Sequence, residues 1–138
     1  MKTIIGWLKR LTTRIVALEN AVLSGVPVVI STTGTTTITA EQAFANVHVL
    51  NTGAAGEVIF ALPPAEVGMR VTATVTTAQL LSLDPVDTEI ITNLAGVALT
   101  EGAAIKGNAI GEWITLLCTT AGRWRAVAGT GTWTATAA

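Results

Sequence analysis

The chain has few of the residues that carry catalysis or bind metal ions. Its 138 residues include one cysteine, one histidine and no tyrosine. A single cysteine excludes an intrachain disulfide framework and any zinc site built from several cysteines. The presence of a single histidine, His48, argues against a catalytic triad and against a metal centre built from histidines. We therefore expect no enzymatic activity, no cofactor and no metal ion.

Charged residues are also scarce, at 12% of the chain, whereas 50% of the residues are hydrophobic. So few charges are unusual for a monomer that covers its own surface, and we expect other subunits to cover part of it. No apolar run approaches the roughly 18–20 residues that span a bilayer. Basic residues interrupt the first apolar run, and no signal-peptide cleavage site follows it. We predict neither a transmembrane segment nor a signal peptide.

The few charges are unevenly distributed. Residues 1–25 carry four basic residues and one acidic residue, a net charge of +3, whereas residues 26–138 carry four basic and eight acidic residues, a net charge of −4. The basic segment suits an acidic protein surface or membrane. Arg123 and Arg125 would share a strand face opposite Trp124, an arrangement that separates stacking from phosphate contact. We expect no nucleic acid partner and interpret the two arginines as rim contacts or ion pairs to a neighbouring subunit.

The first 25 residues have the apolar spacing of a coiled coil. Apolar residues recur at alternating intervals of four and three, which places them at the a and d positions of a heptad repeat. From the first d position onward they are Ile4, Leu8, Leu11, Ile15, Leu18 and Val22. Gly25 and Pro27 are typical of the end of a helix. The sequence thus predicts two units, an α-helix over residues 1–25, roughly 36 Å long, and a second domain over residues 26–138.

Arg14 and Glu19 add a charged pair beside this seam. Arg14 falls at a g position and Glu19 at the following e position, where parallel helices bring opposite charges together. Residues 14–19, RIVALE, resemble the short trimerisation motif of parallel three-stranded coiled coils. The resemblance implies a homotrimer. Its predicted interface contains Ile4, Leu8, Leu11, Arg14, Ile15, Leu18, Glu19 and Val22. An amphipathic membrane helix is the alternative for this segment, and the regular seam favours the coiled coil.

Beyond residue 25 the helical period disappears, and short β-branched runs separated by turn residues take its place. Residues 70–76 alternate strictly between apolar and polar side chains, as a half-buried strand does. The other predicted strands lie within 26–39, in two pieces, and at 47–50, 58–62, 80–83, 89–92, 113–119, 123–128 and 132–136. Only residues 40–45 suggest a helical turn. The pattern predicts a mainly β protein whose body is a compact antiparallel β-sandwich or β-prism.

The residues that could take part in catalysis, metal binding or sugar binding have simpler structural interpretations. His48 lies between two valines and is expected on the outer face of a strand. Cys118 shares a strand face with apolar residues, which indicates core packing. Asp84, Asp87 and Glu89 offer oxygen ligands for a hard cation, but aspartate followed by proline is more typical of a turn. Trp113, Trp124 and Trp133 favour packing between subunits over a sugar-stacking surface.

Several motifs of the body resemble, in order, segments of bacteriophage fibre and decoration domains. They are ALPPA at residues 61–65, GMRVT at 68–72, LDPVDTEI at 83–90, GEW at 111–113, GRW at 122–124 and GTW at 131–133. Over about residues 57–134 the chain resembles a trimeric head-fibre or capsid decoration protein of a phage or prophage. The resemblance implies a structural protein on the capsid surface of a virion, with the major capsid protein or another virion protein as its partner.

The resemblance also implies that the N-terminal end of the stem attaches the fibre. The candidate contacts to the capsid or another partner are Ile5, Trp7, Lys9 and Arg10. The alternative function is a trimeric tail-fibre or tail-tip module that binds a glycan or receptor on the host surface. A membrane-active peptide fused to a β domain is a third possibility, but the seam leads us to expect no membrane contact.

Overall fold

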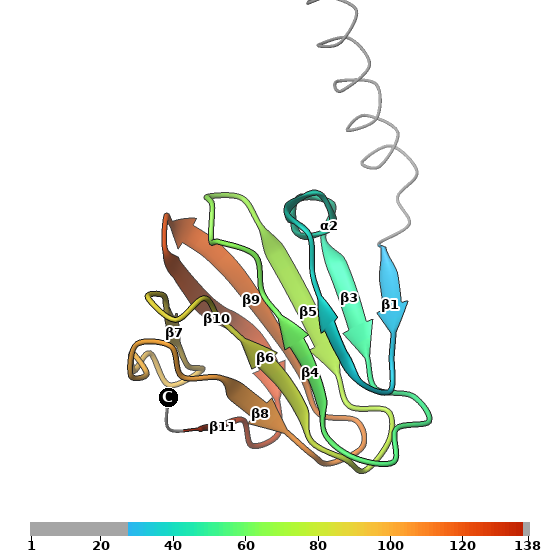
Figure 1. Ribbon diagram of the computed structural model, residues 1–138. Helices are drawn as coiled ribbons and strands as arrows, with labels where there is room; N and C mark the ends of the chain where they lie inside the picture. The colour runs from blue at the N-terminus through green and yellow to red at the C-terminus, as the bar shows by residue number, and fades with distance from the viewer. Residues whose placement is uncertain (1–27, 137–138) are drawn as a thin grey trace, which may run out of the picture.

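The computed structural model of the protein describes residues 28–136, which form a mainly β fold of two facing sheets (Figure 1). This confirms the prediction of a β-rich body. The predicted coiled coil over residues 1–25 lies outside the described residues and stays a prediction, as does the domain boundary after it.

Sheet A has six strands in the order β1-β3-β5-β9-β10-β7. Their bounds are β1 Val29–Ser31, β3 Val47–Leu50, β5 Arg70–Thr74, β9 Trp113–Thr120, β10 Arg123–Thr130 and β7 Ile90–Thr92. Sheet B has five strands in the order β11-β8-β6-β4-β2. Their bounds are β11 Thr134–Ala135, β8 Ile105–Gly107, β6 Leu81–Asp84, β4 Val58–Ala61 and β2 Thr35–Thr37.

From β1 to β9, consecutive strands alternate between the two sheets. Over the first six strands the chain crosses to the opposite sheet and back before each new strand of a sheet, so the new strand runs parallel to the strand two places earlier. In this way β1 pairs with β3, β3 with β5, β2 with β4 and β4 with β6, all in parallel. The first six strands therefore wind as three turns of a flattened coil (Figure 1).

The later strands add antiparallel pairs and one further parallel pair, between β7 and β10. The β9–β10 hairpin pairs with β5 through β9, and β8 pairs with β6 and β11. The prediction of an antiparallel sandwich or prism was wrong in this respect, because the two sheets are mixed. Turn residues between short strands indicate where the chain reverses, but they do not tell whether the next strand joins the same sheet or the opposite one.

Most elements lie where the sequence predicts them. The short helix α2 Ala40–Phe44 begins at a capping box, in which Thr39 Oγ1 accepts from the Gln42 N–H and Gln42 Oε1 accepts from the Thr39 N–H. Strand β8 was not predicted, because its three residues include Lys106 and Gly107 and show too little apolar alternation.

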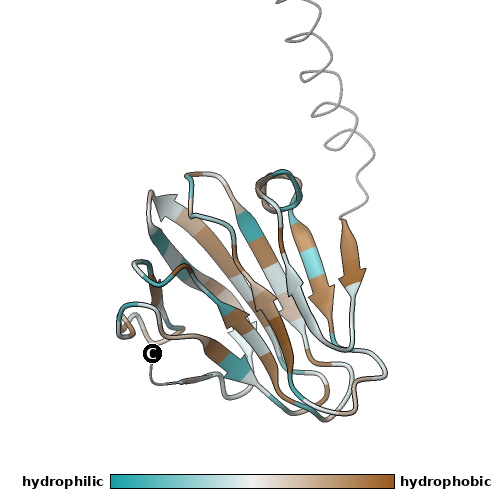
Figure 2. Ribbon diagram, in the orientation of Figure 1, coloured by the Kyte–Doolittle hydropathy of each residue, from teal (hydrophilic) through white to brown (hydrophobic). Residues whose placement is uncertain are grey.

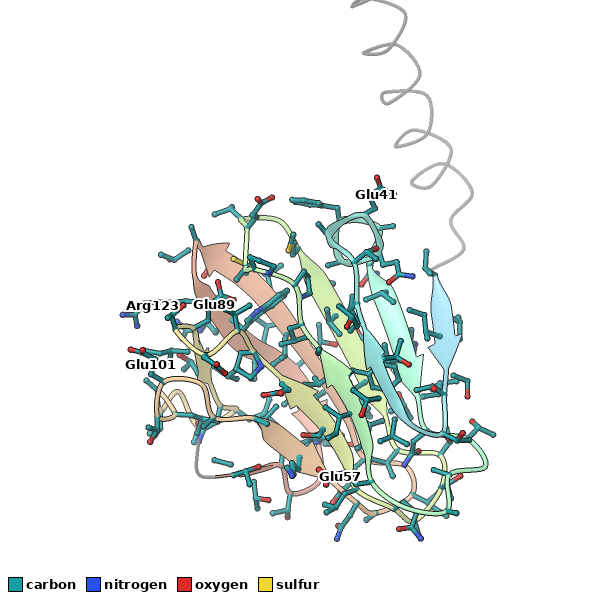
Figure 3. All side chains as sticks on the ribbon, in the orientation of Figure 1. Glu41, Glu57, Glu89, Glu101 and Arg123 are labelled. Carbon is teal, nitrogen blue, oxygen red and sulfur yellow. The ribbon has the colours of Figure 1, made fainter. Side chains whose placement is uncertain are left out.

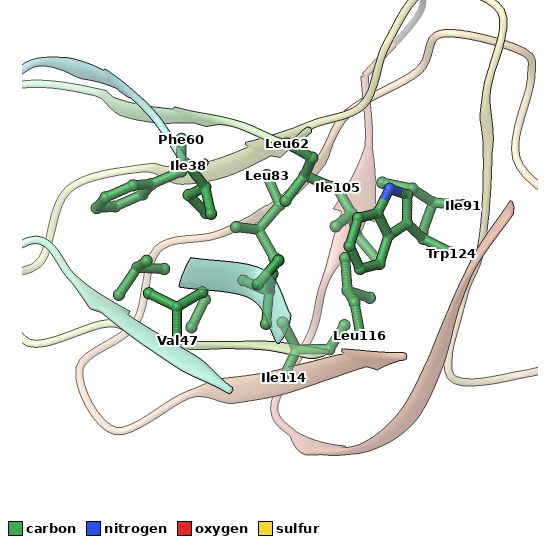
Figure 4. Close-up of a cluster of buried hydrophobic side chains, with 14 of the residues drawn as sticks. Ile38, Val47, Phe60, Leu62, Leu83, Ile91, Ile105, Ile114, Leu116 and Trp124 are labelled. Atoms are coloured by element: carbon green, nitrogen blue, oxygen red, sulfur yellow. The ribbon is translucent and has the colours of Figure 1, made fainter. Parts of the chain in front are cut away.

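The core fills the space between the sheets, and Figure 2 shows bands of hydrophobic residues on strands of both sheets. Alternate residues of β3, β4 and β5 are buried, as expected for strands with one face on a core. Trp124 is fully buried beside the labelled apolar side chains of Figure 4. The prediction that it packs between subunits was wrong, whereas Trp113 and Trp133 remain half-buried.

Asn51 connects two of the crossings between the sheets. Its side chain is fully buried directly after β3. Its amide nitrogen donates to the carbonyl oxygens of Thr77 and Gln79, both at 3.0 Å, and its Oδ1 accepts from the N–H groups of Thr76 and Thr77 at 2.8 and 3.0 Å. This one side chain therefore satisfies four backbone groups of the β5–β6 connection.

Glu89 has a similar role at the opposite end of the sandwich. Both of its carboxylate oxygens accept from the N–H of Ala65, at 3.0 and 2.9 Å, in the connection that follows β4. Glu89 is almost completely buried and lies immediately before β7. A buried carboxylate is costly without such donors, so this contact accounts for an acid in the interior.

Replacing Asn51 by alanine should strongly destabilise the fold. Asn51→Ala removes four hydrogen bonds to backbone groups of residues 76–79, so the free energy of unfolding should fall by about 2–4 kcal/mol. Asn93→Ala is the matched control, because Asn93 Oδ1 accepts from the Ala95 and Val97 N–H groups in an exposed turn. The control should lose about 1 kcal/mol or less. Urea unfolding of both variants measures the difference, and equal losses would contradict the role of Asn51.

Candidate interaction surface

The outer face of sheet A, the side directed away from the core, spans six strands. Paired residues of neighbouring strands share this face, which gives rows across the sheet. One row runs from Val29 through His48 and Thr72 to Thr115. A second runs from Leu50 through Thr74 to Trp113. Most of these side chains are half-buried and uncharged.

A third row contains arginines. Arg70 on β5 pairs with Leu117 on β9, and Leu117 pairs with Arg125 on β10. Two strand spacings separate the arginines, which places their Cα atoms roughly 10 Å apart with a half-buried leucine between them. Arg123, two residues before Arg125, is also exposed. The outer face of sheet A thus presents Arg70 and Arg125 on either side of Leu117, with Arg123 at the start of β10.

None of the eight carboxylates within residues 28–136 lies on a strand of sheet A. Asp84 ends β6 in sheet B, Glu41 lies on α2, and the others lie in connections. In the described part of the chain the only ion pair joins Lys106 of β8 to Glu57. The three arginines of sheet A therefore have no ionic partner within residues 28–136.

The polar centre of the outer face is held by hydrogen bonds between its own side chains. The His48 Nε2 lies 2.7 Å from Thr74 Oγ1, and the hydroxyls of Thr72 and Thr115 lie 2.9 Å apart. Burial lowers the pKa of the His48 imidazole from its ordinary value of 6.5 and favours the neutral ring. As predicted, His48 is on the outer side of its strand, between two fully buried valines.

The other candidate groups of the body have structural roles. Cys118 is buried in the core, as predicted, and burial raises the pKa of its thiol, which disfavours the reactive thiolate. Burial and the nearby Asp87 carboxylate raise the pKa of Asp84. Within residues 28–136 there is no group of three or more histidine, cysteine or acidic side chains arranged to hold a metal ion.

The predicted trimer-interface and attachment residues all lie outside residues 28–136, so their placement stays a prediction. They are Ile4, Ile5, Trp7, Leu8, Lys9, Arg10, Leu11, Arg14, Ile15, Leu18, Glu19 and Val22. The row through Arg70 and Arg125 was not predicted. Strand alternation places each of them on an outer face, but only the pairing through β9 brings them into one row.

Comparisons with protein-family models and with curated proteins find no match to this chain. Among the helices of the described residues, none is long and apolar enough to cross a membrane.

The single histidine allows a direct test of the outer face. NMR titration should give His48 a pKa below 6.5. A lowered pKa means that the unfolded chain binds a proton more readily, so the histidine's contribution to stability is present above pH 6.5 and is lost as the pH falls through the folded pKa. The free energy of unfolding should therefore decrease between pH 7.5 and 5.5, and this decrease should be smaller in His48→Gln. A pKa above 6.5 would contradict the environment described for His48.

Proposed function

We propose that the protein is a homotrimeric structural component of a phage virion, in which a coiled-coil stem presents three β-rich heads on the capsid. The observation that carries the trimer is the a/d seam of residues 4–22 with its Arg14–Glu19 pair. The ordered motifs of residues 57–134 support the assignment to a head fibre or decoration protein.

The path of the chain into the β fold supports a stem followed by a head. Val28 immediately precedes β1, the edge strand of sheet A. The carbonyl oxygen of Val28 accepts from the N–H of His48 at 2.7 Å. The chain therefore enters the fold at an edge rather than across the outer face of a sheet (Figure 1). Three such edges can meet the ends of three parallel helices without covering the heads.

The mechanism of this function is adhesion and presentation rather than catalysis. In a trimer each contact to the capsid occurs three times about one axis. Avidity therefore rises without any contact of a different kind. Lys9 and Arg10 supply positive charge and Ile5 and Trp7 supply apolar area, which together suit an acidic patch on the major capsid protein.

Charge placed in the predicted seam should dissociate the trimer. Leu11→Asp or Ile15→Asp would bury a carboxylate between apolar side chains. Thr13→Asp is the matched control, because Thr13 falls at the outward f position of the same heptad. Native mass spectrometry should detect trimers for the unmodified chain and the control, and monomers for the seam variants. A monomeric unmodified chain at micromolar concentration would contradict the homotrimer.

The position on the particle should distinguish capsid decoration from host recognition. Gold-labelled antibodies against the purified protein should mark the capsids of intact virions. Labelled tails, together with specific binding on a glycan array, would favour the tail-fibre alternative. If the antibodies label neither the capsids nor the tails of intact virions, the proposal is wrong.

A further inference from the structure

We propose that the outer face of sheet A of one subunit packs against acidic side chains of the next subunit in the trimer. This inference rests on the homotrimer proposed above and identifies a second contact, made by the heads themselves. It is carried by the separation of charge in residues 28–136.

The cations and the carboxylates of the head lie on different elements. Three of its four cations, Arg70, Arg123 and Arg125, lie on sheet A, where there is no carboxylate. The fourth, Lys106, is paired with Glu57 on the other side of the sandwich. The eight carboxylates of the head lie on α2, at the end of β6 and in the connections, and Figure 3 shows Glu89 and Glu101 close to Arg123 at the β7 end of sheet A. One chain therefore provides both halves of a complementary contact.

Four of the carboxylates are exposed and not used inside the fold. Glu89 accepts from the Ala65 N–H, and Glu112 accepts from the N–H groups of residues 108, 109 and 132. The carboxylates that remain on the surface are Glu41, Glu66, Asp87 and Glu101. Figure 3 shows Glu41 beside α2 and Glu101 in the connections near β7, so acidic groups are available on more than one side of the head.

Symmetry favours a three-fold contact over a two-fold one. A two-fold axis through this face would place the same patch of both subunits together and bring arginine against arginine. A cyclic trimer instead packs one patch of each subunit against a different patch of the next. Arginines on the face of sheet A and exposed carboxylates outside its strands, on the same chain, fit that second arrangement.

The side chains of the face are suited to burial between subunits. Arginine forms bidentate hydrogen bonds with carboxylates, and it is enriched in interfaces together with tryptophan. Leu117 lies between Arg70 and Arg125, and Trp113 is half-buried on the same face. The N-terminal segment of the chain is a poor occupant, because its net charge is +3.

Zero-length cross-linking of the full-length chain tests this contact. In Arg125→Lys, the introduced amine keeps the charge and can be coupled by a carbodiimide to a carboxylate that it touches. Mixed trimers of ¹⁴N- and ¹⁵N-labelled chains identify links between subunits. We expect intersubunit links from position 125 to Glu41, Glu66, Asp87 or Glu101. Thr35→Lys, on the exposed edge strand of sheet B, is the matched control and should give no such links.

Charge reversal gives a second readout. The double variant Arg70→Glu/Arg125→Glu should raise the concentration at which trimers dissociate by about tenfold or more, whereas Thr35→Glu should leave it unchanged. Trimers without intersubunit links from position 125, or with unchanged dissociation in the double variant, would overturn this contact and leave the homotrimer intact. A monomeric unmodified chain would overturn both proposals, so the two failures are distinguishable.

Discussion

The alternation of consecutive strands between the two sheets is the constraint on which the rest of the structure depends. Each strand of the first three turns gains its partner only when the chain has crossed the sandwich and returned. The crossing connections leave backbone groups that no ladder pairs, and polar side chains satisfy them. Asn51 does so after β3 and Glu89 does so before β7. These two buried polar side chains therefore stabilise the winding.

The same winding determines the surface. β9 and β10 form a hairpin inserted between β5 and β7, and this insertion brings arginines from residues 70 and 125 into one row. The carboxylates occupy α2, the end of β6 and the connections, outside the strands of sheet A. Three of the four cations of the head therefore lie on strands of sheet A, whereas its carboxylates lie outside those strands.

Local patterns predicted the elements of the fold well. The alternation at residues 70–76 predicts β5, and the helical turn expected at residues 40–45 corresponds to α2. The fully buried Trp124 shows the limit of such patterns. Alternation places Trp124 on the strand face opposite Arg123 and Arg125. It does not tell whether that face packs against the core or against a neighbouring subunit. Strand β8 was missed, because three residues carry too little periodicity to be recognised.

The sequence by itself determined that the body is β-rich, where most strands lie and which side of each strand is apolar, because these properties follow from neighbouring residues. It also carries the heptad seam and the phage-like motifs on which the proposed function rests. Only the tertiary structure decided the mixed sheets, the burial of Trp124 and the row that joins Arg70 to Arg125. These depend on contacts between residues far apart in the chain, and the period of a single strand does not specify its partner.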